Sequence, residues 1–223
     1  MGATMRRNKD RLYVGLYVRR GALRMAGGEN RYHWALLRGP KVEDENTLLT
    51  KYHATESPGS SESGGSESGG SDSSASSPTE LSSATSSSSA SWTYAEQTMP
   101  TYDLMLLARV LIGKVRNPSR LETILRGVPV PLAALTDKDR LNQPPGWNCV
   151  GWVQSALEAL AADAGGAMGK SSNLDWTAVR DASLEYVEQK ATEHRYDGLA
   201  PVGQFDLAKP ATFDLVLGQE VAP

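Results

Sequence analysis

The first half of the chain alternates apolar and polar residues with the two-residue period of β-strands. Segments of this kind, rich in Tyr, Val, Leu or Trp, occupy residues 11–19, 31–38, 47–55, 92–98 and 104–115. Such runs, bounded by turn residues, predict five strands. In the last segment one face carries Leu106, Ala108, Val110 and Ile112, and we expect this strand to form the centre of the sheet.

The second half of the chain changes to the longer period of helices. Ser119 and Glu122 form a capping-box pattern, which predicts a short helix that stops at Gly127. A second helix is predicted to begin at Cys149, directly after a stretch rich in proline and glycine, and to run to about Asp163.

A third helix is predicted to begin at a capping Asp175 and to run to about His194. Its buried stripe is predicted to be Trp176, Val179, Ser183, Val187 and Ala191. Residues 205–216 suggest one more extended segment. Strands followed by helices predict an α+β fold, in which helices of the C-terminal half pack on an antiparallel sheet of the N-terminal half.

A tract of Ser, Gly and Glu at residues 56–91 interrupts the strand patterns. It has too few large apolar residues to offset its chain entropy, so we predict a disordered insertion. Because strand patterns flank it on both sides, we expect it to lie within one α+β domain of residues 11–198. Residues 1–10 are predicted to be a flexible basic N-terminus, and residues 199–223 a C-terminal extended segment or tail.

The composition narrows the class of protein. A net charge of −3, 39% hydrophobic residues and a single cysteine in 223 residues indicate a globular chain that suits a reducing compartment. The chain has no apolar run of bilayer length and no secretory signal at its polar start, so we expect a cytoplasmic or nucleocytoplasmic protein without a membrane span. Phosphate-loop, Gly-x-Ser-x-Gly and zinc-ligand patterns are missing, so we expect no cofactor, no metal and no specific nucleic-acid partner.

The single cysteine, Cys149, stands where a nucleophile would be placed. A thiol at a helix N-terminus lies near unpaired N–H groups and the positive end of the helix dipole, and both favour the thiolate. The alternative is that Cys149 only fills the core, as most lone cysteines do. Four further residues are candidates for a substrate pocket: Trp147, Asn148 and Trp152 beside the cysteine, and Tyr13 on the first strand.

Two of the three histidines, His33 and His53, lie on predicted neighbouring strands upstream of the cysteine. Cross-strand partners on one face lie about 5 Å apart, so His53 can bond the far nitrogen of His33 and fix its tautomer. His33 would then be the base for Cys149, with His53 as its orienter. The alternative is that each histidine is a structural polar residue.

These motifs resemble a known family. A histidine in a His-Trp-Ala-Leu strand, a second histidine on the next strand and a downstream Asn-Cys helix start are similar to the circularly permuted papain-like fold of the NlpC/P60 superfamily. The motif layout most resembles the lecithin:retinol acyltransferase and HRAS-like-suppressor group. This resemblance implies that Cys149 is the nucleophile, His33 the base and His53 the orienter. The overall look of the chain also resembles that of uncharacterised fungal proteins, which implies no substrate.

The sequence therefore predicts a cysteine-dependent hydrolase or acyltransferase that forms a thioester on Cys149 with a small amide or ester substrate. Two alternatives remain: a non-catalytic binding module with a degenerate papain-like cleft, and an isopeptidase-like thiol protease. A Cys149 sulfur within about 4 Å of a His33 nitrogen, in an open cleft, would favour the enzyme.

Overall fold

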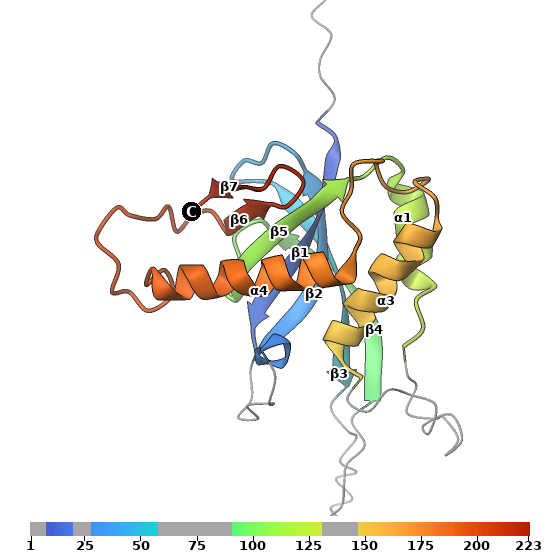
Figure 1. Ribbon diagram of the computed structural model, residues 1–223, viewed down its shortest axis with the longest axis horizontal. Helices are drawn as coiled ribbons and strands as arrows, with labels where there is room; N and C mark the ends of the chain where they lie inside the picture. The colour runs from blue at the N-terminus through green and yellow to red at the C-terminus, as the bar shows by residue number, and fades with distance from the viewer. Residues whose placement is uncertain (1–7, 20–27, 58–90, 131–146) are drawn as a thin grey trace, which may run out of the picture.

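The computed structural model describes residues 8–19, 28–57, 91–130 and 147–223. These residues form a seven-stranded sheet in the order β4-β3-β2-β1-β5-β6-β7, with three α-helices, which confirms the α+β class (Figure 1). The strands are β1 (Asp10–Val18), β2 (Tyr32–Pro40), β3 (Leu48–Ser57), β4 (Ser91–Pro100), β5 (Leu106–Lys114), β6 (Ala211–Asp214) and β7 (Gln219–Ala222). The helices are α1 (Pro118–Arg126), α3 (Cys149–Ala162) and α4 (Trp176–Thr192), with a short 3-10 turn at Glu29–Arg31.

The sheet is mixed rather than antiparallel as predicted. Neighbouring strands from β4 to β5 pair antiparallel, but β6 runs parallel to β5. Because β6 and β7 extend the sheet beyond β5, the central strand is β1 and not the predicted 104–115 segment. The β1 strand pairs along most of its length with both β2 and β5, and six successive residues in it are buried.

A register shift in β5 shows that one residue was assigned to the wrong face of this strand. Ala108 pairs with Leu16, but Leu106 pairs with Tyr17, so one extra residue of β5 lies between the two pairs. Such a bulge turns the following side chains to the other face. Leu106 therefore packs with Tyr17, on the face opposite to Ala108, Val110 and Ile112.

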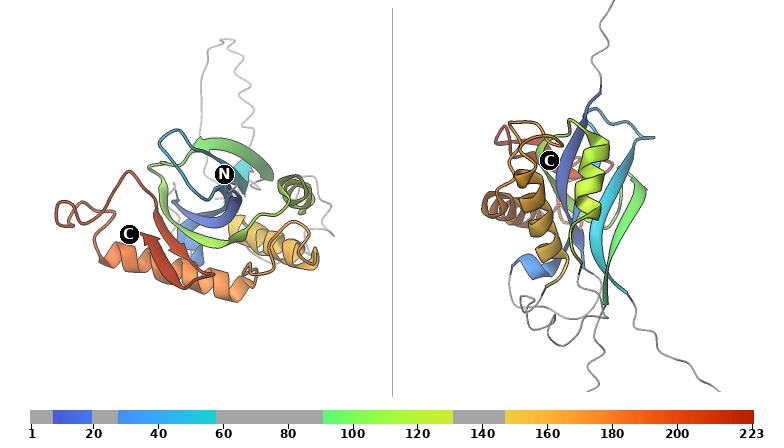
Figure 2. Two further views of the ribbon diagram at one scale, coloured as in Figure 1. Left: turned by 90° about the horizontal axis from the view of Figure 1, so that it is seen from above. Right: turned by 90° about the vertical axis from the view of Figure 1, so that its right-hand side faces the viewer.

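Helices α1, α3 and α4 cover one face of the curved sheet (Figure 2). The main hydrophobic core lies between this face and the helices, and a smaller cluster lies on the opposite face. The main core includes Trp34, Leu36, Tyr52 and Cys149, whereas Tyr17 and Ala35 belong to the smaller cluster. Side chains alternate along β2, so residues next to each other in sequence serve opposite faces.

Two helix termini differ from the sequence prediction. The first helix begins two residues earlier than a Ser119 cap would give: Asn117 is the N-cap, its side chain accepts from the Arg120 amide, and Pro118 occupies the first turn. The third helix is capped by Asp175 as predicted but ends at Thr192.

The buried residues of α4 also differ from the predicted stripe: Trp176 is only half-buried, and Tyr186 is buried although it was not predicted to be. Ala191 is exposed, and Lys190 is buried in its place. Its ammonium forms ion pairs with Glu193 at 2.5 Å and with Glu220 of β7 at 2.6 Å. The ion pair with Glu220 connects α4 to β7. The helical period of the sequence alone does not predict this contact.

The C-terminal residues belong to the domain. Residues 211–222, predicted to lie in a segment outside a domain that ends at 198, form β6 and β7 of the same sheet. The ends of the predicted insertion, residues 56–57 and 91, belong instead to β3 and β4, which pair over ten positions. Its residues 58–90 lie outside the described part of the chain. The same holds for residues 1–7 of the predicted flexible N-terminus. No helix in the described ranges is long and apolar enough to cross a bilayer.

Candidate active site

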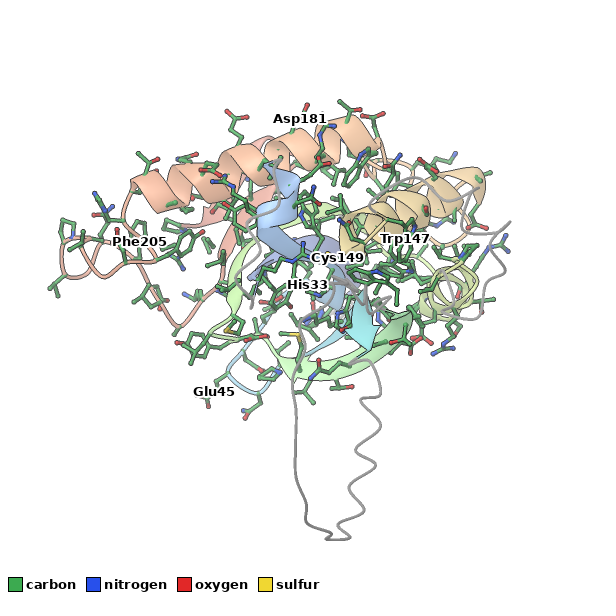
Figure 3. The ribbon with its side chains drawn as sticks, turned by 90° about the horizontal axis from the view of Figure 1, so that it is seen from below. His33, Glu45, Trp147, Cys149, Asp181 and Phe205 are labelled. Carbon is green, nitrogen blue, oxygen red and sulfur yellow. The ribbon has the colours of Figure 1, made fainter. Side chains whose placement is uncertain are left out.

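The site lies where β2 and β3 separate. These strands pair only through residues 36–38 of β2 and 50–52 of β3, although β2 pairs with β1 along its whole length. At the opening, the Trp34 amide, which has no β3 partner, donates a hydrogen bond to the Cys149 sulfur at 3.5 Å. Figure 3 shows Cys149 and His33 together in the middle of the molecule, where the start of α3 reaches the sheet.

Asn148 fixes the start of α3. Its side-chain oxygen accepts from the amides of Val150 at 2.8 Å and Gly151 at 3.4 Å, and its Nδ2 donates to Asn30 at 2.8 Å. An asparagine at this position satisfies helix N–H groups that would otherwise lack a partner. Asn148 is therefore the cap that positions Cys149. Its side-chain oxygen and nitrogen are both engaged in these hydrogen bonds, rather than in lining the predicted substrate pocket.

Replacing Asn148 with alanine should lower the free energy of unfolding by about 1 kcal/mol, since one cap is lost. It should also change the alkylation rate of Cys149, because the start of α3 loses its anchor. Urea unfolding and iodoacetamide labelling measure the two effects. Asn117→Ala, which removes the equivalent cap of α1, is the control and should affect stability alone. Equal labelling rates for both variants would contradict this role of Asn148.

The two histidines are in contact, as strand alternation predicted. His33 Nε2 lies 2.8 Å from His53 Nδ1, and the rings are nearly perpendicular, at 82°. This contact engages Nε2 of His33, so Nδ1, the ring nitrogen closer to the backbone, is the nitrogen available to act as a base. A His33 that donates from Nε2 to His53 carries its free lone pair on Nδ1, which is the tautomer that a base requires.

Both histidines are neutral at pH 7. Burial lowers the pKa of His33 to about 3, and the charges of His53, Lys51 and Arg19 add to this effect. Burial and the Lys51 charge lower the pKa of His53 to about 4. A neutral imidazole can accept a proton, so both rings are available as bases over most of the pH range, although the lowered pKa makes each a weaker base than a free histidine.

The Cys149 thiol is buried, with 1% of the residue exposed. Burial raises its pKa, although the Trp34 amide and the Arg19 charge oppose the shift. Burial therefore opposes the thiolate that the helix N-terminus was expected to favour, because desolvation outweighs the backbone amides and the Arg19 charge near the sulfur. Among the described residues, the hydrogen bond found for the sulfur is with the Trp34 amide, and none joins it to an imidazole.

The raised pKa of Cys149 predicts the pH dependence of alkylation. The thiolate is the reactive form, so the iodoacetamide rate of the native protein should rise with a midpoint above about 8.5, the ordinary cysteine value. In urea the midpoint should return to that value. A native midpoint well below the unfolded one would show a preformed thiolate and contradict the burial argument.

A hollow of about 430 Å³ opens beside the histidines. It is lined by Tyr17, Val18, Arg19, His33, Lys51, His53, Thr55, Trp92, Asp103 and Met105. The histidines face this hollow, whereas Cys149 belongs to the core on the helix side. The separation of β2 and β3 is therefore the place where the histidines and Cys149 approach each other.

The other predicted pocket residues divide into two groups. Trp147 is half-buried next to the site, with its ring edge-on to Trp92 at 5.8 Å. Trp152 is fully buried in the main core. Tyr13 lies on β1 under the Arg109 guanidinium and lines a different cavity of about 740 Å³. The structure thus places Trp147 at the site, and places Trp152 and Tyr13 away from it.

Sequence reasoning missed several residues around the histidines. Lys51 precedes His53 by two positions, so the alternation along the strand already put both on one face. Arg19, Trp92 and Asp103 reach the hollow from other segments, and no motif marks them. In the described ranges, no three His, Cys, Asp or Glu residues lie close enough to hold a metal ion.

The chain was also compared with known proteins. A model of a family of unknown function (DUF6914) matches residues 9–222. The chain belongs to this family. The matched range runs from β1 to β7, so the whole described sheet falls within it. Neither the curated proteins nor the solved structures gave a match.

Proposed function

We propose that this protein is a cysteine-dependent acyl-transfer enzyme with a circularly permuted papain-like fold, similar to that of the lecithin:retinol acyltransferase group. One observation carries the proposal. The sulfur of Cys149, the only cysteine, lies at the start of a helix and contacts the amide of Trp34, the residue after His33, and His33 in turn contacts His53. A nucleophile, a base and an orienter in this order are the parts of a thiol acyl-transfer site. An unpaired thiol of this kind suits the cytoplasm.

The reaction begins with an ester or amide carbonyl beside the sulfur. Cys149 gives its proton to His33 Nδ1 as the sulfur attacks the carbonyl carbon, and His53 holds the ring through Nε2. The Cys149 amide, at the start of α3, donates to the oxyanion, and one such donor is worth about 3 kcal/mol. His33 then protonates the departing alcohol or amine, which leaves a thioester on Cys149.

Water, or an acceptor alcohol or amine, resolves the thioester. His33 takes a proton from this second nucleophile as it attacks the thioester carbonyl, and the sulfur leaves as a thiolate that regains its proton from the His33 imidazolium. Because thiol and imidazole are both neutral at rest, the proton moves during the attack and not before it. This differs from a resting thiolate–imidazolium pair, and it follows from the burial that raises the pKa of Cys149 and lowers that of His33.

A non-catalytic binding module is the second candidate. The burial of Cys149 favours it, because a sulfur that is 1% exposed is not open to substrate in the resting protein. In this case the hollow beside the histidines would bind a ligand without any covalent step.

Turnover of 4-nitrophenyl esters separates the two functions. The enzyme should release a burst of 4-nitrophenol close to one equivalent of protein, followed by slower steady turnover as the thioester is resolved. The burst amplitude should fall in parallel with the fraction of Cys149 alkylated beforehand. If the protein releases 4-nitrophenol no faster than protein whose Cys149 is fully alkylated, the proposed enzymatic function is overturned and the binding module is the remaining candidate.

A further inference from the structure

Six cations gather at the end of the sheet where β1 begins and β5 ends, and Figure 1 shows these two strand ends side by side. They are Lys9, Arg11, Lys41, Lys114, Arg116 and Lys170. Within the described ranges no ion pair is found for any of them, although the chain as a whole carries a net charge of −3. The histidines lie at the other end of the sheet, since His33 pairs with Tyr17 near the end of β1. The basic end is therefore separate from the candidate active site.

The backbone holds these cations close to one another. Arg11 of β1 lies directly opposite Lys114 of β5, where side chains are about 5 Å apart and like charges destabilise the pairing. The Gly169 amide donates a hydrogen bond to the Lys114 carbonyl at 2.8 Å, and Lys170 follows directly after this contact. The fold thus brings like charges from three separate segments together.

The pKa of Lys114 reflects this crowding of positive charge. It is lowered chiefly by the charge of Lys9, together with desolvation and the charges of Arg11, Arg116 and Lys41. Each of these charges is positive, so the nearby charges that act most strongly on Lys114 repel it. A bound anion relieves such repulsion, because it supplies the opposite charge that the neighbouring side chains do not.

A hollow of about 770 Å³ lies among the cations, and its volume is within the usual range of small-ligand sites. Four of the six cations line it: Lys9, Lys114, Arg116 and Lys170. Asp10 is the one carboxylate among the described residues of its lining, and this side chain faces Arg38 at 3.7 Å. The hollow is therefore basic.

A turn at residues 169–172 adds uncharged donors to the same hollow. The Ser172 amide closes the turn on the Gly169 carbonyl at 3.0 Å. Between them, the amides of Lys170 and Ser171 have no hydrogen-bond partner in the part of the chain that the structure describes, and both residues are exposed in the lining of the hollow. Free backbone N–H groups of a turn are suited to hold an anion.

We propose that this hollow binds a small organic polyphosphate, that is, a soluble molecule with several phosphate groups. Phosphate oxygens accept hydrogen bonds from ammonium, guanidinium and backbone N–H groups, and all three kinds of donor line the hollow. Several phosphates, rather than one, can reach cations that come from residues 9, 114–116 and 170. The concave shape favours a small molecule over a flat membrane surface or a nucleic-acid helix. This site is independent of the proposed acyl transfer.

Calorimetric titration with inositol hexakisphosphate tests the proposal. The titration is run in about 0.15 M salt, which screens exposed charges more than roughly 8 Å apart. The wild-type protein should bind one molecule saturably. Lys114→Gln and Lys170→Gln should each raise Kd about 10-fold, as expected for a lost charge-assisted hydrogen bond. Lys114→Arg keeps the charge and should keep most of the affinity, which separates a lost contact from a fold defect.

Lys209→Gln is the matched control. It makes the same change in net charge at an exposed lysine that pairs with Asp206 and lies outside the hollow. Its Kd should equal that of the wild-type protein. If Lys209→Gln weakens binding as much as Lys114→Gln does, the anion senses only the overall charge of the protein, and the site is overturned.

Three further probes test the class of ligand. Citrate, a polyanion of carboxylates, should bind at least about 10-fold more weakly than inositol hexakisphosphate, and equal affinity would overturn the choice of phosphate. Vesicles that contain phosphatidylinositol 4,5-bisphosphate and a short RNA duplex test the two macromolecular sources of phosphate. If either of these binds while free inositol hexakisphosphate does not, or if none of the probes binds, the proposal of a small polyphosphate ligand is overturned.

Discussion

Cys149→Ala should lower kcat/KM for ester turnover by about 10³-fold or more, since removal of a covalent nucleophile abolishes the acyl-enzyme route. The chain has no second thiol that could take over the attack. The fold should survive, because the substitution removes one buried atom and the cost of such a small core deletion is of order 1 kcal/mol. Release of 4-nitrophenol measures the activity, and urea unfolding measures the stability.

Ser183→Ala is the matched control for this variant. Ser183 lies buried on α4, and its hydroxyl has no hydrogen-bond partner among the described residues. Both substitutions therefore remove one γ atom from the interior, but only one touches the proposed chemistry. Activity of Cys149→Ala within tenfold of the Ser183→Ala value would contradict a covalent role for the thiol.

His33→Ala should lower kcat/KM at pH 7 by about 10²- to 10⁴-fold, the usual contribution of a general base. The loss should shrink at high pH, because the thiol then ionises without a base. In the wild-type protein the pKa of His33 is lowered to about 3, so the imidazole stays neutral and basic down to that region. The wild-type rate should therefore stay nearly flat between pH 7 and about 5, well below the ordinary histidine pKa.

His194→Ala is the control for the base. His194 is exposed after the end of α4, where its Nδ1 lies 2.8 Å from the Asp197 carboxylate. Its loss removes an imidazole from the chain without touching the site. Equal rates for His33→Ala and His194→Ala across the pH range would exclude His33 as the base.

The strands and the histidine contact could be predicted because they depend on short-range alternation. Period-two patterns placed all five N-terminal strands within a few residues of their bounds. The same alternation put His33 and His53 on one face of adjacent strands, and their rings are in contact. The catalytic roles of these residues and of Cys149 remain predictions.

Other features depend on long-range pairing that no local pattern encodes. The sheet centre moved to β1 because two short strands near the C-terminus added to the far edge of β5. The Trp34 amide and the Cys149 sulfur are 115 positions apart in the sequence, so no local pattern could predict their contact. The helix start predicted an acidic Cys149, but its pKa rises because of burial, which only the folded core determines.

The central claim is that Cys149 is acylated by substrate. Mass spectrometry of the protein quenched in acid during turnover of a 4-nitrophenyl ester tests it most directly. We predict one added acyl mass, mapped to the peptide that holds Cys149 and released by hydroxylamine, with far less adduct in His33→Ala at pH 7. An unmodified wild-type protein during turnover, or an acyl group on another residue, would contradict the account.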